Sequence, residues 1–82
     1  MEIEILKIAE DTYTVFHKTL NKKIGEMTPR GIGRWNFERE PDWSGGEIPA
    51  AVVFDCITEQ KAIAFLTELL NTFMTNSVKV FN

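Results

Sequence analysis

The chain has 82 residues, of which 44% are hydrophobic and 26% are charged, and its formal net charge is −3 at pH 7. These values are typical of a single folded domain over residues 1–82 and exclude a disordered chain. A chain of this length buries roughly 60% of its unfolded surface, which is enough for one core but not for an additional deep substrate cavity.

The sequence carries no signal for a membrane or a secretory route. The longest uncharged apolar stretch, residues 48–54, is far shorter than the roughly 20 residues of a spanning helix. The chain begins with acidic residues and lacks a basic segment of the kind that opens a signal peptide. Its single cysteine, Cys56, excludes an internal disulfide. We therefore expect a cytoplasmic protein that makes no membrane contact.

Two readings are open for residues 11–27, which follow a predicted first strand at residues 2–8. As two strands, residues 12–17 are rich in β-forming side chains, and a turn at Leu20-Asn21-Lys22 leads into the next strand. As a helix, Gly25 would cost about 1 kcal/mol in the last turn. Asp11 would cap the amino end of this helix. One face of the helix would carry an apolar stripe: Tyr13, Phe16, Leu20, Ile24 and Met27. We favour the strands.

The central part of the chain predicts two more strands. Residues 32–39 alternate, with Trp35 and Phe37 on one side and polar residues (Arg34, Asn36 and Glu38) on the other. We expect Trp35 in the core. Residues 50–55 form an apolar run after Pro49, which predicts a buried strand. Between them, residues 40–47 are the longest irregular segment and the one expected to be most mobile.

An amphipathic helix is the firmest prediction near the carboxyl end. Thr58 is a good N-cap, and Glu59 places a negative charge in the first turn. Residues 59–74 contain no glycine or proline, and their apolar side chains share one broad face: Ala62, Ile63, Leu66, Leu69, Leu70 and Phe73. Val78, Val80 and Phe81 predict a short closing strand.

These elements predict an α+β fold. The strand reading of residues 11–27 gives an antiparallel β-meander of four to five strands packed by one C-terminal amphipathic helix. The helix reading gives the alternative, a ferredoxin-like β-α-β-β-α-β order. In both folds the last helix lies against the sheet.

Positive charge is concentrated in one window of the sequence, residues 12–37. The rest of the chain is acidic. This basic window holds the single acid Glu26 and five basic residues: Lys18, Lys22, Lys23, Arg30 and Arg34. In a hairpin, its three lysines gather at one end, with the two arginines on the next loop and strand. Such a surface would steer an acidic protein partner. Together with the rings of Trp35 and Phe37 it would also suit nucleic acid, although the acidic net charge argues against that partner.

Other residues offer weaker functional signals. Trp43, in the irregular segment, is either a partner anchor or part of a lid that completes the core. His17 is expected on the surface at a strand end, and Cys56 as a small hydrophobic residue rather than a reactive thiol. The acidic run of Glu38, Glu40 and Asp42 lacks the spacing of a metal-binding loop.

The sequence therefore predicts a non-enzymatic binding or regulatory module that acts by contact with a protein partner or by homo-oligomerisation. The alternative is a nucleic-acid-binding β-surface that uses residues 18–34. No catalytic residue, metal ligand or cofactor site is expected. The predicted partner-binding residues are the loop tryptophan and the basic window: Trp43, Arg34, Arg30, Lys22, Lys23 and Lys18.

Overall fold

A computed structural model describes residues 2–43, 48–56, 58–73 and 77–81. Five strands come first in the chain: β1 (Glu2–Ala9), β2 (Thr12–His17), β3 (Lys22–Gly31), β4 (Arg34–Arg39) and β5 (Ala51–Asp55). They are followed by helix α1 (Glu59–Phe73) and strand β6 (Ser77–Phe81), of which the backbone alone is described.

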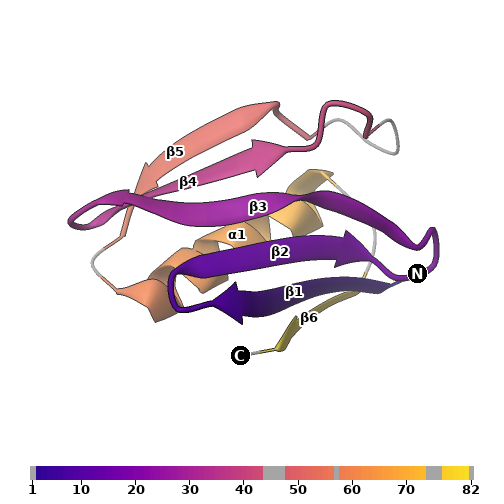
Figure 1. Cartoon of the computed structure of the whole chain (residues 1–82), viewed down its shortest axis with the longest axis horizontal. Coiled ribbons are helices and arrows are strands. Elements are labelled where there is room, and N and C mark those ends of the chain that lie inside the picture. Colours follow the sequence, from indigo (N-terminus) through magenta and orange to yellow (C-terminus); the bar gives the residue numbers. More distant parts are fainter. Residues whose placement is uncertain (1, 44–47, 57, 74–76, 82) are drawn as a thin grey trace.

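The strands form one sheet in the order β5-β4-β3-β2-β1-β6 (Figure 1). Strands β1 to β5 are an antiparallel meander, and β6 pairs in parallel with β1. Helix α1 connects the two edges, because it leaves β5 and leads to β6 on the far side. The α+β class and the strand reading of residues 11–27 are confirmed. The helix that the ferredoxin-like alternative needs there is replaced by β2 and β3.

Helix α1 covers one face of the sheet, which we call the helix-covered face. In Figure 1 it crosses behind the central strands, so that the opposite, uncovered face points at the viewer. Thr58 caps the helix, since its Oγ1 accepts a hydrogen bond from the Lys61 N–H at 3.2 Å. The helix and the strands bury their apolar side chains in one core: Ile3, Ile5, Tyr13, Val15, Ile24, Met27, Trp35, Phe37, Phe54, Ala62, Ile63, Leu66 and Leu70.

Three details differ from the sequence predictions. The strand predicted at residues 50–55 exists as β5, but the expectation that it is buried is wrong because β5 is an edge strand, with Val53 47% exposed. Ile32 belongs to the β3–β4 turn, where it is fully exposed and Gly33 has a φ of 71°. Phe73 ends the helix and is half-exposed rather than buried. Residues 44–47, half of the irregular segment that was expected to be mobile, lie outside the described residues.

A β-bulge in β3 determines which side chains share the uncovered face. Val15 pairs with Gly25 and Phe16 pairs with Lys23, so Ile24 is an extra residue in the ladder. Residues three apart in a regular strand point to opposite faces, whereas this insertion brings Lys23 and Glu26 to the same face. Gly25 is required here, because a Cβ atom would lie 2.3 Å from the Glu38 carbonyl oxygen.

No helix among the described residues is long and apolar enough to cross a membrane.

Candidate functional site

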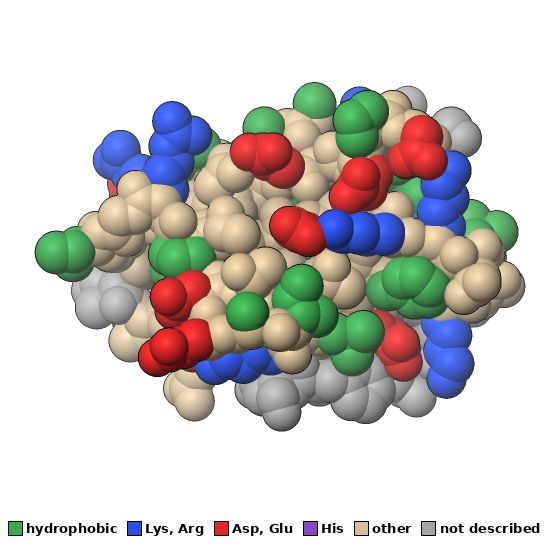
Figure 2. Space-filling model, in the orientation of Figure 1, with side chains coloured by type: hydrophobic (Ala, Val, Ile, Leu, Met, Phe, Trp, Pro, Cys, Tyr) green, Lys and Arg blue, Asp and Glu red, His purple; other side chains and the backbone are tan. Residues whose placement is uncertain are grey.

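The structure divides the basic window between the two ends of the sheet. Lys18, Lys22 and Lys23 lie at the β2–β3 turn, as a hairpin predicts, but Arg30 and Arg34 flank the β3–β4 turn. Because a strand rises about 3.3 Å per residue, β3 separates these two groups by about 25 Å. Figure 2 accordingly has Lys and Arg side chains, in blue, at both ends of the molecule. The five cations therefore do not form one compact patch.

Acidic side chains lie beside three of these cations. Lys22 Nζ is 3.4 Å from the Asp42 carboxylate and also donates to the Asp42 carbonyl oxygen at 3.1 Å. Arg34 Nε donates to the Asp55 carboxylate at 2.9 Å. Lys23 lies between two glutamates, described below. These internal pairs reduce the charge that the basic window can offer to an acidic partner.

Trp43 is buried, with 5% of its surface exposed, and belongs to the core. Its ring lies 5.8 Å from the His17 ring, and its Nε1 is buried without a hydrogen-bond partner among the described residues. Trp43 was expected to be either a partner anchor or part of a lid that completes the core. Its burial agrees with the second expectation. The prediction that His17 is a surface residue is wrong: it is 2% exposed, and its Nδ1 accepts a hydrogen bond from the Leu20 N–H.

The two aromatic residues of β4 also lie in the core. Trp35 is 8% exposed and Phe37 is fully buried, both on the helix-covered face. The prediction that Trp35 is a core residue is confirmed. Neither ring lies beside the cations of the basic window on the open surface, where a nucleic-acid base would stack.

The uncovered face carries a polar recess with a volume of about 230 Å³. It lies over β3, β4 and the residues that follow β4, where Figure 2 has acidic side chains, in red, in the upper half of the face. The lining is mostly polar: Glu26, Thr28, Asn36, Glu38, Arg39, Glu40 and Pro41. Sites for small molecules usually enclose about 300–1,000 Å³, so the recess is better matched in size to a protruding side chain.

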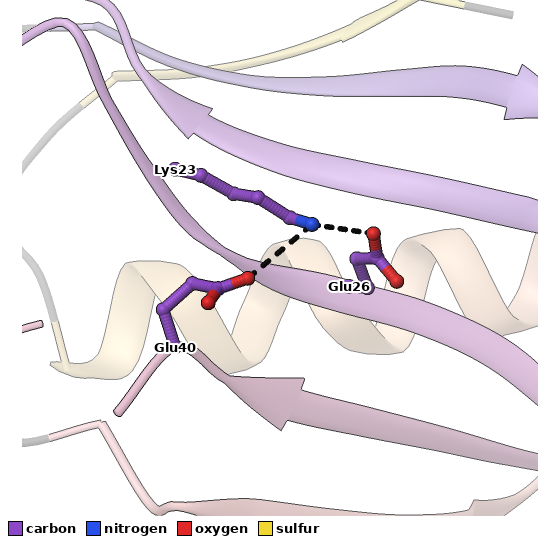
Figure 3. Close-up of polar contacts among 3 residues, drawn as sticks. All are labelled: Lys23, Glu26 and Glu40. Atoms are coloured by element: carbon purple, nitrogen blue, oxygen red, sulfur yellow. Dashed lines mark hydrogen bonds and ion pairs between the residues drawn. The ribbon is translucent and has the colours of Figure 1, made fainter. Parts of the chain in front are cut away.

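Lys23 bridges two of the carboxylates at this recess (Figure 3). Its Nζ donates a short hydrogen bond to Glu26 and lies 3.3 Å from Glu40. The hydrogen bond to Glu26 raises the pKa of Lys23, and the hydrogen bond to Glu40 adds to this effect. Lys23 is therefore charged at neutral pH and links β3, which carries both Lys23 and Glu26, to the start of the loop after β4.

Two carboxylates of the recess face each other across the sheet. Glu26 on β3 pairs directly with Glu38 on β4, and opposed residues of this kind have Cβ atoms only about 5 Å apart. Like charges in this arrangement destabilise a sheet. Lys23 partly neutralises Glu26, whereas Glu38 has no cation beside it among the described residues and receives the amide N–H of Asn36, at 3.0 Å. The recess thus holds three carboxylates and two cations, Lys23 and Arg39, and the Arg39 guanidinium donates to the Ile48 carbonyl oxygen at 2.8 Å.

Asn36 lies under these carboxylates and is more than nine-tenths buried, with 7% of its surface exposed. Its amide nitrogen donates to Glu38, and its side-chain carbonyl is a further acceptor group of the lining. The recess therefore presents acceptor groups of two kinds, carboxylate and amide. Such a lining suits a ligand that brings N–H donors and positive charge.

Within the described ranges of the chain, no three His, Cys, Asp or Glu side chains are close enough together to hold a metal ion. The acidic run that the sequence offers is divided, because Asp42 pairs with Lys22 while Glu38 and Glu40 line the recess. Cys56 is half-buried at the end of β5.

A second polar cluster joins the amino end of α1 to the sheet. The Tyr13 hydroxyl donates to Glu59 Oε1 at 2.5 Å, and Lys7 Nζ lies 3.2 Å from the same oxygen. Burial, together with the hydrogen bond to Glu59, raises the pKa of Tyr13 above its ordinary range. The hydrogen bond from Tyr13 holds the pKa of Glu59 below its ordinary value. This cluster ties the amino end of α1 to strands β1 and β2.

Sequence reasoning named Lys23 but missed its two partners. Glu26 is the single acid of the basic window. The alternation of a regular strand would place it on the other face of the sheet from Lys23. The extra residue at Ile24 reverses that expectation. The only available signal is Gly25 inside a strand pattern, which indicates a bulge or a close approach of backbones.

Comparisons with known proteins give no match: no family model fits the sequence, and no curated protein and no solved structure is significantly similar to it. The geometry of the chain itself therefore carries its functional interpretation.

Proposed function

We propose that this chain is a small non-enzymatic binding module that contacts a protein partner through its uncovered sheet face. The polar recess receives a lysine- or arginine-bearing segment of that partner. The observation that carries the proposal is the excess of carboxylates at the recess, where Glu26 and Glu38 face each other over the buried amide of Asn36.

Charge complementarity selects the partner. The three carboxylates of the recess outnumber its two cations, Lys23 and Arg39, so the recess stays negative, and the whole chain has a net charge of −3. A guanidinium group would donate its N–H groups to the side-chain oxygens of Glu38 and Asn36, in the planar arrangement that arginine uses with carboxylates. It would also relieve the repulsion between the opposed carboxylates. The affinity for the partner therefore includes a cation beside Glu38, a contact that the free protein lacks among its described residues.

Lys23 acts as the resident cation of the recess in the free protein. Its side chain is 37% exposed, so water screens its ion pairs and they rearrange at small cost. An incoming cation either joins Lys23 between the carboxylates or displaces it from Glu40. In both cases affinity depends on ionic strength, and the association rate more steeply so.

The basic window keeps a smaller role under this proposal. Arg30 is exposed at the β3–β4 turn, at the end of the sheet opposite to the three lysines. Its charge and that of Arg34 lie outside the recess, where they orient a partner with mixed charge rather than bind it directly.

The test is a titration of the ¹⁵N-labelled chain with two synthetic peptides of equal length, one of alternating Arg and Ser and one of alternating Glu and Ser. We expect the arginine peptide to shift the amide resonances of Glu26, Thr28, Asn36 and Glu38, and the glutamate peptide to shift none. Glu38→Gln should weaken binding about threefold to tenfold, the loss expected for one exposed charge contact.

A matched control separates the recess from general attraction. Glu68→Gln removes the same charge from an exposed position on α1. Equal losses for the two variants would contradict the proposal, since they would indicate attraction to net charge. A single-stranded oligonucleotide is titrated in parallel. Shifts confined to residues 18–23 with the oligonucleotide, and none with the arginine peptide, would overturn the proposal in favour of a nucleic-acid surface.

A further inference from the structure

Strand β5 forms a free edge of the sheet. Its exposed side chains are small and apolar at two positions, Ala51 and Val53, and its one charged residue, Asp55, is paired with Arg34 at 2.9 Å. The surface along this edge is therefore close to neutral, in contrast to the recess.

The hydrogen-bond pattern identifies which backbone groups of β5 point outward. The Arg39 N–H donates to the Ala50 carbonyl oxygen, and the Cys56 N–H donates to the Gly33 carbonyl oxygen, both at 2.9 Å. Bonded positions alternate in an antiparallel ladder, so residues 50, 52, 54 and 56 face β4. Ala51, Val53 and Asp55 then direct their N–H and C=O groups to the free edge.

This edge lacks the protection that free strands usually carry. The β1–β2, β2–β3 and β3–β4 ladders each contain a register shift, whereas the β4–β5 ladder is regular along its whole length. Proteins protect edges with bulges, prolines and lysines, and β5 has none of these between Ala51 and Asp55. A regular, neutral and apolar edge is a template for another strand.

We propose that this edge binds a second copy of the chain, with β5 pairing antiparallel to β5 of the copy across a two-fold axis at Val53. In this register Val53 faces its equivalent, and Ala51 faces Asp55 in both directions. Every outward backbone group then meets an outward group of the copy, and each facing pair exchanges two hydrogen bonds. If the register shifts by one pair, outward backbone groups stay unpaired or Pro49, which has no N–H to donate, enters the contact.

Two further observations favour a copy over an unrelated strand. The edge is neutral, so two copies approach there without the repulsion that a net charge of −3 creates elsewhere. A two-fold axis through the sheet also places both helices on the same side of the joined sheet. Phe65 of α1, which stacks on Phe54 at 4.3 Å and is 39% exposed, then lies beside the junction in both copies.

The contact is small, because five residues of β5 supply its strand pairing. Interfaces of this kind fall below about 1,200 Å² of buried surface, the range of transient complexes. We therefore expect a weak dimer whose population rises with concentration, rather than a permanent one. This inference uses a different surface from the polar recess and stands independently of it.

The experiment is sedimentation equilibrium of the full chain over a range of concentrations. Val53→Pro removes an outward N–H and leaves the bonds between β4 and β5 in place, because proline is tolerated on edge strands. We expect this variant to dimerise at least about tenfold more weakly than the wild type. The control Val53→Thr keeps the N–H and the β-branched shape and should dimerise like the wild type.

A second variant covers the case in which Val53→Pro disturbs the fold. Val53→Lys keeps every backbone donor but places two positive charges at the two-fold axis, and it should also lose dimerisation. In the wild type, the amide hydrogens of Ala51, Val53 and Asp55 should exchange more slowly with solvent as the protein concentration rises. A wild-type chain that stays monomeric at millimolar concentration would overturn the proposal. So would a dimer that Val53→Lys leaves unchanged.

Discussion

The two faces of the sheet differ in the kind of side chain that they carry and in how deeply they bury it. On the helix-covered face, the side chains of the central strands are almost wholly buried and apolar, as at Ile5, Val15, Met27 and Phe37. On the uncovered face, the same strands carry half-buried or exposed polar side chains held by ion pairs, as at Lys23 and Glu26. The free energy of folding therefore comes mainly from the helix-covered face, whereas the uncovered face is the one that we propose contacts a partner.

The largest expected contrast between the faces is a matched pair of phenylalanine substitutions. Phe37→Ala removes a fully buried ring from the helix-covered face and should lower the free energy of unfolding by about 3–5 kcal/mol. Phe16→Ala removes a half-buried ring from the uncovered face and should cost about 1 kcal/mol, because less apolar area returns to water. Urea denaturation of both variants measures the difference. Equal losses would contradict the division between the faces.

Trp43 provides the next contrast, because it was a candidate for recognition and lies in the core. Its burial predicts that Trp43→Ala lowers the free energy of unfolding by about 3 kcal/mol, through the cavity left beside His17. Thermal unfolding followed by circular dichroism measures the loss. Trp43→Phe, which keeps most of the apolar volume, should lose less than half as much. A Trp43→Ala variant that melts like the wild type would instead return this residue to the binding surface.

The sequence predicted most of the fold because local patterns determine most of it. The hairpin at residues 11–27 followed from its β-forming residues and from Asn21, which has a φ of 53° in the turn. The helix followed from its cap and its apolar face. The edge position of β5 was missed, since an apolar run looks the same in a central and in an edge strand. Only the order of strands, a long-range property, distinguishes the two.

The candidate site was less predictable than the fold. Alternation placed Arg34 and Glu38 on the polar side of β4 correctly, and the hairpin grouped the three lysines. The recess itself depends on the bulge at Ile24 and on the pairing of β3 with β4, which bring Lys23, Glu26 and Glu38 together. Residues that meet through register in this way leave little trace in a single sequence. His17 was misplaced because its burial depends on Trp43, a neighbour from a distant loop.

The smallest expected effect lies at the border of the helix-covered face, in the cluster of Tyr13, Glu59 and Lys7. The pKa of Glu59 is held below its ordinary value of 4.5, so its carboxylate stabilises the fold fully above pH 4.5 and less as the pH falls below it. The pKa of Tyr13 is raised above its ordinary value of 10.0. Its contribution is complete below pH 10 and is lost as the pH rises further.

Tyr13→Phe removes both effects at once. The difference in the free energy of unfolding between wild type and Tyr13→Phe should be about 1 kcal/mol at pH 7, since Glu59 is partly exposed and water screens the contact. That difference should shrink below pH 4.5 and again above pH 10. Glu59→Gln should remove the acid limb and reduce the alkaline limb, because burial still raises the pKa of Tyr13 without the carboxylate. Glu68→Gln, on the exposed side of the same helix, should change neither limb. Urea denaturation at pH 3.5, 7 and 10.5 measures all four chains. A constant difference across this range would mean that the hydroxyl acts through packing, and the cluster would then belong to the apolar core rather than to its polar border.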